Sequence, residues 1–142
     1  MIKQLVNGVD VNKEYQQFRN LSVFDQYNLP EAVNITINEH KHTRWVSGSQ
    51  QGSNIALIVH KKSKPEAIRE VLLHEVCHLA LDVGGKEGHQ LHDIIFQDLL
   101  LQSAFEAFGV RIKVPKGEGW KCIAYAMDEK IVRSMYAKKR YT

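Results

Sequence analysis

Residues 63–82 read SKPEAIREVLLHEVCHLALD, and they form the most informative stretch of the sequence. Its apolar side chains recur at three- and four-residue spacing, which is typical of a helix packed on one side. The pattern predicts a helix over residues 64–82 that starts with an S-x-x-E capping box at Ser63 and stops before the glycines at 84–85. The apolar positions are Ile68, Val71, Leu72, Val76 and Leu79.

His74 and His78 stand four residues apart inside this predicted helix and form an HExxH motif with Glu75. Residues four apart lie on one helix face, so the two imidazoles can converge on one cation. Glu75 lies beside that face, where it can serve as the base toward a zinc-activated water. Ordinary core or surface histidines are the alternative, but a core helix rarely places such groups on its inner side. We predict one Zn²⁺ ion with Glu75 as the catalytic residue.

A catalytic zinc site uses three protein ligands and keeps a fourth position open. Gly84 stands where the metzincin pattern would need a third histidine, so that class is excluded. The remaining candidates are His89, His92 and Asp93. We predict His92, because Phe96 lies one turn further along the same face and would anchor it in the core. His89 is the alternative if the loop is tighter, and Asp93 would leave two nearby histidines unused.

The rest of the chain supplies helices and strands around the HExxH helix. An amphipathic helix is predicted over residues 11–27 and a strongly apolar one over 93–108. We predict an α+β fold in which a small, mostly antiparallel three-stranded sheet packs against the HExxH helix and its neighbours, as in zincins. The predicted strands cover residues 33–38, 42–47 and 54–59, and the Ser- and Gln-rich stretch 48–52 connects the last two.

The composition fits one folded domain over residues 1–142. Hydrophobic residues make up 44% and charged residues 25%, which excludes disordered and collagen-like chains. The apolar runs are far shorter than the ~20 residues that cross a bilayer, so no membrane partner is expected. The two cysteines, Cys77 and Cys122, form no CxxC pair. A disulfide framework is therefore not expected, and a cytoplasmic location is predicted.

The basic residues are concentrated at the C-terminal end. Residues 111–142 carry 9 Lys and Arg against 3 Asp and Glu, whereas residues 1–110 carry 10 against 13. Strand-like runs at 110–114 and 120–127 include aromatic side chains. We predict that this basic extension, residues 110–142, makes weak contacts with DNA that do not depend on base sequence. A solvated charged face is the alternative.

About residues 12–108 resemble the SprT-like zinc metalloproteases, which include the Spartan proteases that act on DNA–protein crosslinks. Family members carry HExxH and then a third histidine in a GHGxxF-like segment. His92 and Phe96 match the spacing of that segment, while Gly88 and His89 match its glycine lead-in. Many members also have a four-cysteine zinc ribbon; this chain has only Cys122 there, so we predict a single metal. The segments that carry the resemblance are FDQYNLPEAVNITIN (24–38), NIALIV (54–59), HEVCH (74–78) and GHQLHDIIF (88–96).

The resemblance implies a zinc-dependent peptidase. We predict that it acts on protein or peptide substrates, with DNA-associated proteins among them. One alternative is a metal-dependent hydrolase of another bond, such as an RNA phosphodiester. A second is a catalytically idle zinc-containing module that binds nucleic acid or a partner. The zinc site of such a module would be closed by four protein ligands. It would therefore need both His89 and His92, or Cys77, in addition to the HExxH histidines. The candidates for stabilising an oxyanion are His42, Arg44 and His60.

Overall fold

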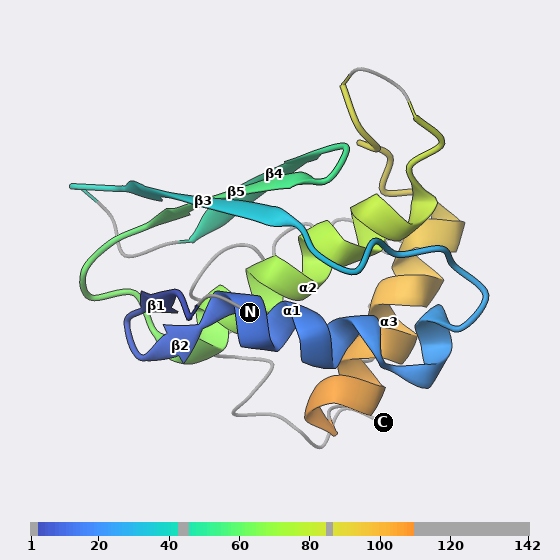
Figure 1. Cartoon of the computed structure of the whole chain (residues 1–142), viewed down its shortest axis with the longest axis horizontal. Coiled ribbons are helices and arrows are strands. Elements are labelled where there is room, and N and C mark those ends of the chain that lie inside the picture. Colours follow the sequence, from blue (N-terminus) through green and yellow to red (C-terminus); the bar gives the residue numbers. More distant parts are fainter. Residues whose placement is uncertain (1–2, 43–45, 85–86, 110–142) are drawn as a thin grey trace.

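The computed structural model describes residues 3–42, 46–84 and 87–109. Its helices and strands confirm the predicted α+β class (Figure 1). No described helix is long and apolar enough to cross a membrane. The strand-like runs predicted at 110–114 and 120–127 lie outside the described residues. In chain order the elements are β1 (Leu5–Val6), β2 (Val9–Asp10), α1 (Val11–Arg19), the 3₁₀ helix η1 (Ser22–Phe24), β3 (Asn34–Glu39), β4 (Ser47–Gln51), β5 (Asn54–Val59), α2 (Pro65–Leu81) and α3 (Ile94–Phe108).

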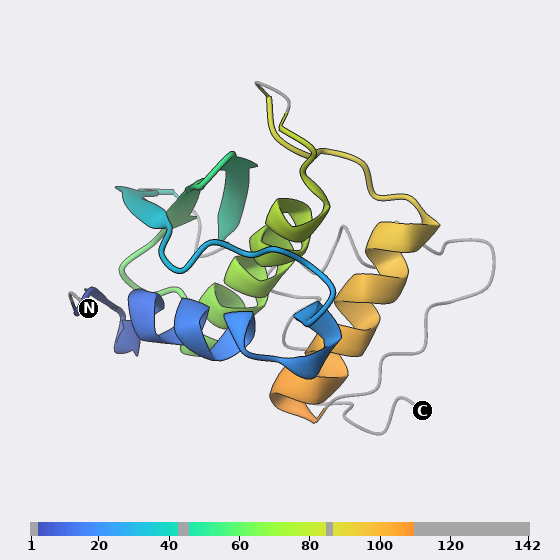
Figure 2. The same ribbon diagram turned by 45° about the vertical axis from the view of Figure 1, so that its right-hand side comes forward.

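The HExxH helix, α2, is the centre of the fold. Figures 1 and 2 show it between the sheet and the other two helices, and it packs against α1, α3, β4 and β5. Every residue from Ala67 to Leu79 except Arg69 is buried, including the polar side chains of Glu70, His74, Glu75 and His78. The sequence predicted a helix with one inner face, whereas most of the circumference of α2 is buried, because helices pack on it from one side and the sheet from the other.

The predicted bounds of α2 are correct to within one residue at each end. The predicted capping box is wrong, because Lys64 occupies the N-cap and no side chain caps it. The Ser63 hydroxyl instead accepts a hydrogen bond from the His60 backbone N–H at 3.0 Å. Pro65 still fits the first turn, where the N–H that it lacks would have had no partner inside the helix.

The three-stranded sheet has the order β3-β5-β4. Strand β5 pairs in parallel with β3 and antiparallel with β4, so the sheet is mixed rather than mostly antiparallel. Strand β5 takes the central place because it is the most apolar of the three, and its alternate residues Ile55, Leu57 and Val59 are buried. The predicted β3 and β5 are observed close to their expected bounds.

Strand β4 differs from the prediction. A strand was expected over residues 42–47 and a connection over 48–52, but residues 47–51 form the strand and the turn follows it. Gly52 makes this turn possible with a φ of 56°. The polar sequence SGSQQ has a low strand propensity, which pairing with β5 and packing on α2 override.

Helix α1 ends at Arg19 and does not continue to residue 27 as predicted. The apolar pattern continues, but the chain turns at Leu21 and forms the short helix η1. The Glu106 carboxylate on α3 accepts hydrogen bonds from the backbone N–H groups of Ser22 and Val23, at 2.6 and 3.0 Å. A distant side chain therefore caps η1, which the local sequence could not reveal.

The β1–β2 hairpin was not predicted from the sequence. Asn7 and Gly8 form its turn with positive φ angles of 48° and 86°. An Asn-Gly pair between apolar residues is a strong signal for such a hairpin, so the signal was present in the sequence. The hairpin delivers Asp10 to the start of α1, where its carboxylate accepts from Lys13 N–H at 3.3 Å.

Replacing Glu106 with Gln is expected to lower the free energy of unfolding by about 0.5–1 kcal/mol at pH 7, within the range for a lost helix cap at an exposed site. Desolvation raises the pKa of Glu106, but the hydrogen bonds from Ser22 and Val23 lower it by a larger amount. The pKa of Glu106 in the folded protein is therefore below the ordinary glutamate value. Because the pKa of Glu106 is lower in the folded protein than in the unfolded chain, its carboxylate stabilises the fold at pH values above the ordinary glutamate pKa. This stabilisation is lost as the pH falls through the pKa of the folded state.

Urea denaturation at pH 7 and at acidic pH measures this effect. The difference between wild type and Glu106→Gln should shrink on acidification. The exposed carboxylate of Glu31 provides the matched control, and Glu31→Gln should change little at either pH. A penalty of equal size at both pH values would contradict the proposed charge-dependent cap.

Candidate metal centre

Three histidine side chains meet beside the C-terminal half of α2. His74 and His78 come from successive turns of α2, and His92 comes from the segment that leads into α3. The Nε2 atom of His78 lies 3.1 Å from that of His74 and 3.2 Å from that of His92, and the third distance is also 3.2 Å. The structure thus brings together the three residues predicted as metal ligands.

The near-equilateral triangle of nitrogen atoms fits a metal ion better than mutual hydrogen bonds. A neutral imidazole carries one proton on two nitrogens, so three Nε2 atoms cannot all satisfy one another. Tetrahedral ligands at 2.0–2.1 Å from a zinc-sized ion are separated by about 3.3 Å, close to the observed spacing. The donor set therefore fits a divalent transition metal.

The protonation states of the three histidines also suit a metal site. Desolvation, followed by the neighbouring histidines, lowers the pKa of His78 to about 3. The same causes lower the pKa values of His74 and His92. Neutral imidazoles are the form that binds metal, so the cluster needs no deprotonation at neutral pH.

Phe96 supports the cluster from the core side. Its fully buried ring stacks on His78 with centroids 4.3 Å apart and meets His74 edge-on at 4.8 Å. Asp93, the least favoured ligand candidate, is the N-cap of α3, and its carboxylate accepts from Phe96 N–H at 3.0 Å. This cap fixes the start of α3 and with it the position of His92.

Glu75 is buried next to the histidines and beneath β4. Burial raises the pKa of its carboxyl to about 8. Strand β4 approaches it closely at Gly48, where a Cβ atom would lie 3.1 Å from Glu75 Oε2 and 3.0 Å from a methyl group of Val71. A glycine at this position therefore leaves room for the Glu75 side chain between the strand and the helix.

His89, the alternative third ligand, lies outside the triangle. Its Nδ1 is 2.8 Å from Nδ1 of His78, the nitrogen on the opposite side of the ring from the cluster. Its backbone N–H donates to the side chain of Gln50, a residue that the sequence analysis missed. Nothing in the pattern SGSQQ distinguishes Gln50 from its neighbours, because its partners are distant in the sequence.

The other candidates named from the sequence are not part of the cluster. Cys77 points to α3, where its sulfur lies 3.4 Å from the Ser103 hydroxyl, and burial raises its pKa to about 12. The ring nitrogen Nδ1 of His60 accepts from the Lys62 backbone N–H at 3.0 Å. His42 is exposed after β3, and Arg44 lies outside the described residues.

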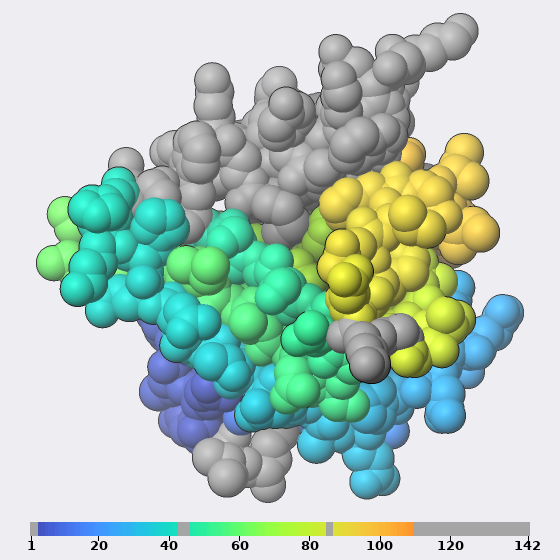
Figure 3. Space-filling view, turned by 90° about the horizontal axis from the view of Figure 1, so that it is seen from above, coloured from blue at the N-terminus to red at the C-terminus, as the bar shows by residue number. Residues whose placement is uncertain are grey.

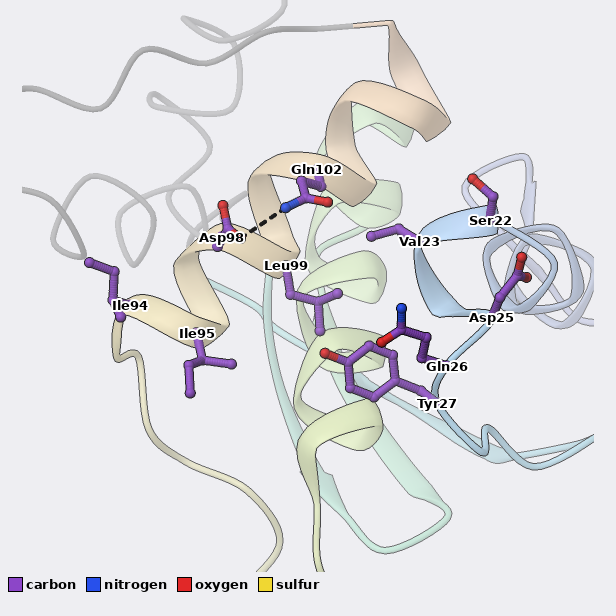
Figure 4. Close-up of a pocket in the computed structure, with 10 residues that line it drawn as sticks. All are labelled: Ser22, Val23, Asp25, Gln26, Tyr27, Ile94, Ile95, Asp98, Leu99 and Gln102. Atoms are coloured by element: carbon purple, nitrogen blue, oxygen red, sulfur yellow. Dashed lines mark hydrogen bonds between the residues drawn. The ribbon is translucent and has the colours of Figure 1, made fainter.

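A pocket of about 560 Å³ lies between η1 and the first turns of α3. Figure 4 shows Tyr27 and Leu99 facing each other across it. None of its lining residues belongs to the histidine cluster, so the pocket is a separate feature. It is lined by Ser22, Val23, Asp25, Gln26, Tyr27, Ile94, Ile95, Asp98, Leu99 and Gln102.

Three neutral imidazoles around one point define a candidate transition-metal site within an α+β domain. The chain belongs to the SprT-like family, which it matches over residues 12–116. SprT-like domains are of the metalloprotease type, in agreement with the resemblance recognised from the sequence. The chain has no significant match among curated proteins or among solved structures.

Proposed function

We propose that this protein is a zinc-dependent metallopeptidase that hydrolyses peptide bonds. The observation that carries the proposal is the triangle of Nε2 atoms from His74, His78 and His92, with the buried carboxylate of Glu75 adjacent on α2. Membership of the SprT-like family supports the same activity. Three imidazole ligands favour zinc among the common metals of hydrolases.

His74, His78 and His92 would hold the ion through their Nε2 atoms. Bound zinc would polarise the scissile carbonyl and acidify a water molecule. Glu75 would accept the proton of the attacking water on its carboxylate and deliver it to the leaving amine. The position of Glu75 supports this role, because its buried side chain lies on α2 next to His74.

The ligand count separates this proposal from an idle zinc-binding module. A structural zinc site is closed by four protein ligands, whereas a catalytic site has three. Within residues 3–42, 46–84 and 87–109, the group that could hold a metal contains three histidines. His89 and Cys77, the candidates for a fourth ligand, both have other partners. This arrangement favours an open, catalytic position.

Incubation of the zinc-loaded protein with an unfolded protein substrate tests the proposal. New peptide termini detected by mass spectrometry are expected, and a chelator should abolish them until zinc is restored. A parallel reaction with single-stranded RNA tests the rival phosphodiesterase. Zinc-dependent RNA cleavage without peptide cleavage would overturn the proposal.

We propose further that the substrates include DNA-associated proteins, which the basic extension of residues 110–142 would help to reach. Its seven lysines and arginines from 116 onward are interspersed with Trp and Tyr residues on which unpaired bases can stack. Such contacts are expected to be weak and independent of base sequence. The residues concerned are Lys116, Lys121, Lys130, Arg133, Lys138, Lys139, Arg140, Trp120, Tyr125, Tyr136 and Tyr141.

A salt titration of single-stranded DNA binding is expected to show a linear fall of log affinity with log salt, by about 0.7 per phosphate contacted. Replacing four basic residues of the extension with Gln should reduce this slope, because fewer counterions are released. The control replaces four exposed lysines of the described domain. Equal slopes for the two variants would contradict a DNA-binding role of the extension. The substitutions in the extension variant are Arg133→Gln, Lys138→Gln, Lys139→Gln and Arg140→Gln. Those in the control are Lys13→Gln, Lys41→Gln, Lys61→Gln and Lys62→Gln.

A further inference from the structure

The buried side chain of Gln50 connects three separate parts of the fold. Its amide nitrogen donates to the Gly52 carbonyl at 3.0 Å and to the Asp82 carboxylate at 2.6 Å. Its amide oxygen accepts from the His89 backbone N–H at 2.9 Å. One side chain thus connects the β4–β5 turn, the end of α2 and the segment that contains His89 and His92.

The backbone of the segment that contains His89 also lies against the backbone of β4. Gly88 has a φ of 76°, and a Cβ at this position would overlap the carbonyl oxygen of Gln50. Figure 3 shows the yellow surface of this segment against the green surface of β4 and β5. Only glycine combines this backbone conformation with such close contact, so the segment is fixed immediately before His89.

His89 in turn contacts the metal ligand His78. The two Nδ1 atoms are 2.8 Å apart, which is hydrogen-bond distance and requires a proton between them. Nε2 of His78 faces the other two ligands, so the proton of a neutral His78 belongs on Nδ1. His78 therefore donates to His89, which accepts with Nδ1.

The other α2 ligand lacks this support. Nδ1 of His74 is buried and has no hydrogen-bond partner among the described residues, so its ring is oriented by packing, including the contact with Phe96. Of the two ligands on α2, His78 is the one whose ring is oriented by a hydrogen bond to a segment outside that helix. Such bonds fix the tautomer and direction of a ligand and raise its basicity.

We propose that Gln50 and His89 form a positioning relay for the metal centre, in which Gln50 fixes the backbone of His89 and His89 fixes the ring of His78. This inference rests on the proposed metal-binding function and adds two residues that do not touch the metal. The relay also links metal affinity to strand β4, since Gln50 belongs to that strand.

Competition with a chromophoric chelator measures the zinc affinity of the full chain and its variants. His89→Phe keeps a ring but removes the acceptor, and its affinity is expected to fall by about 10- to 100-fold. His89→Asn offers an oxygen near the position of Nδ1 and should recover most of the affinity. Loss of a ring contact alone would not be rescued by Asn, so the pair separates positioning from packing.

Gln50→Leu removes all three hydrogen bonds of the Gln50 side chain while keeping a similar volume. Its zinc affinity should also fall, whereas that of the control Gln51→Leu, on the exposed neighbour, should not change. Because both positions act through His78, the double variant Gln50→Leu/His89→Phe should lose less than the two single losses combined. The visible spectrum of the Co²⁺-loaded protein should shift in the variants, since the ligand geometry changes.

The relay is overturned if His89→Phe binds zinc like wild type, if His89→Asn is as weak as His89→Phe, or if the double variant shows fully additive losses. These outcomes differ from a failure of the proposed function. If wild type itself bound no zinc, both proposals would fall together. If wild type bound zinc tightly and the variants did likewise, the relay alone would fall.

Discussion

Glu75→Gln is expected to retain the fold and the bound metal while losing peptide hydrolysis by about 10²- to 10⁴-fold, the contribution typical of a positioned general base. The amide preserves the shape of the side chain between β4 and α2 but cannot accept the proton of the attacking water. Burial also favours the neutral amide, since it leaves no charge to desolvate.

The rate of peptide cleavage and the zinc content are measured on the same preparation. Glu66→Gln provides the control, because it makes the same change in the first turn of α2, away from the histidines. This control should keep full activity. If Glu75→Gln lost zinc together with activity, Glu75 would be a ligand and the site would be built differently.

His92→Ala is expected to weaken zinc binding by more than the about 10- to 100-fold that follows removal of a residue supporting a ligand. One of the three Nε2 atoms disappears, and the remaining pair on α2 leaves the ion open to solvent on that side. Because Asp93 still caps α3 and Phe96 stays in the core, the fold should persist.

Metal analysis after dialysis compares His92→Ala with Gln90→Ala, an exposed neighbour in the same segment. Gln90→Ala should keep its zinc. If His89→Ala lost more zinc than His92→Ala, the third ligand would be His89, and the observed triangle would not be the metal site.

The parts of the site that are local in sequence could be predicted without a structure. His74 and His78 were found because a four-residue spacing has a fixed meaning on a helix. His92 was predicted from its spacing to Phe96, although His92 itself lies just before Asp93, the N-cap of α3. Only the His74–His78 pair follows from a short spacing alone, because His92 reaches the other two through the packing of α3 against α2.

The parts that depend on distant partners could not be predicted. Strand β4 has a polar sequence, and it forms a strand only because β5 pairs with it. The capping of η1 needs Glu106 from the far end of the chain, so α1 appeared longer than it is. Gln50 gains its role from residues 32 and 39 positions away, Asp82 and His89.

A crystal structure of the zinc-loaded protein, with anomalous scattering recorded at the zinc edge, would show whether these three histidines bind zinc. We expect one zinc ion bound by Nε2 of His74, His78 and His92, with a solvent molecule as the remaining ligand. A zinc ion held by four protein ligands, or bound away from these histidines, would contradict this expectation.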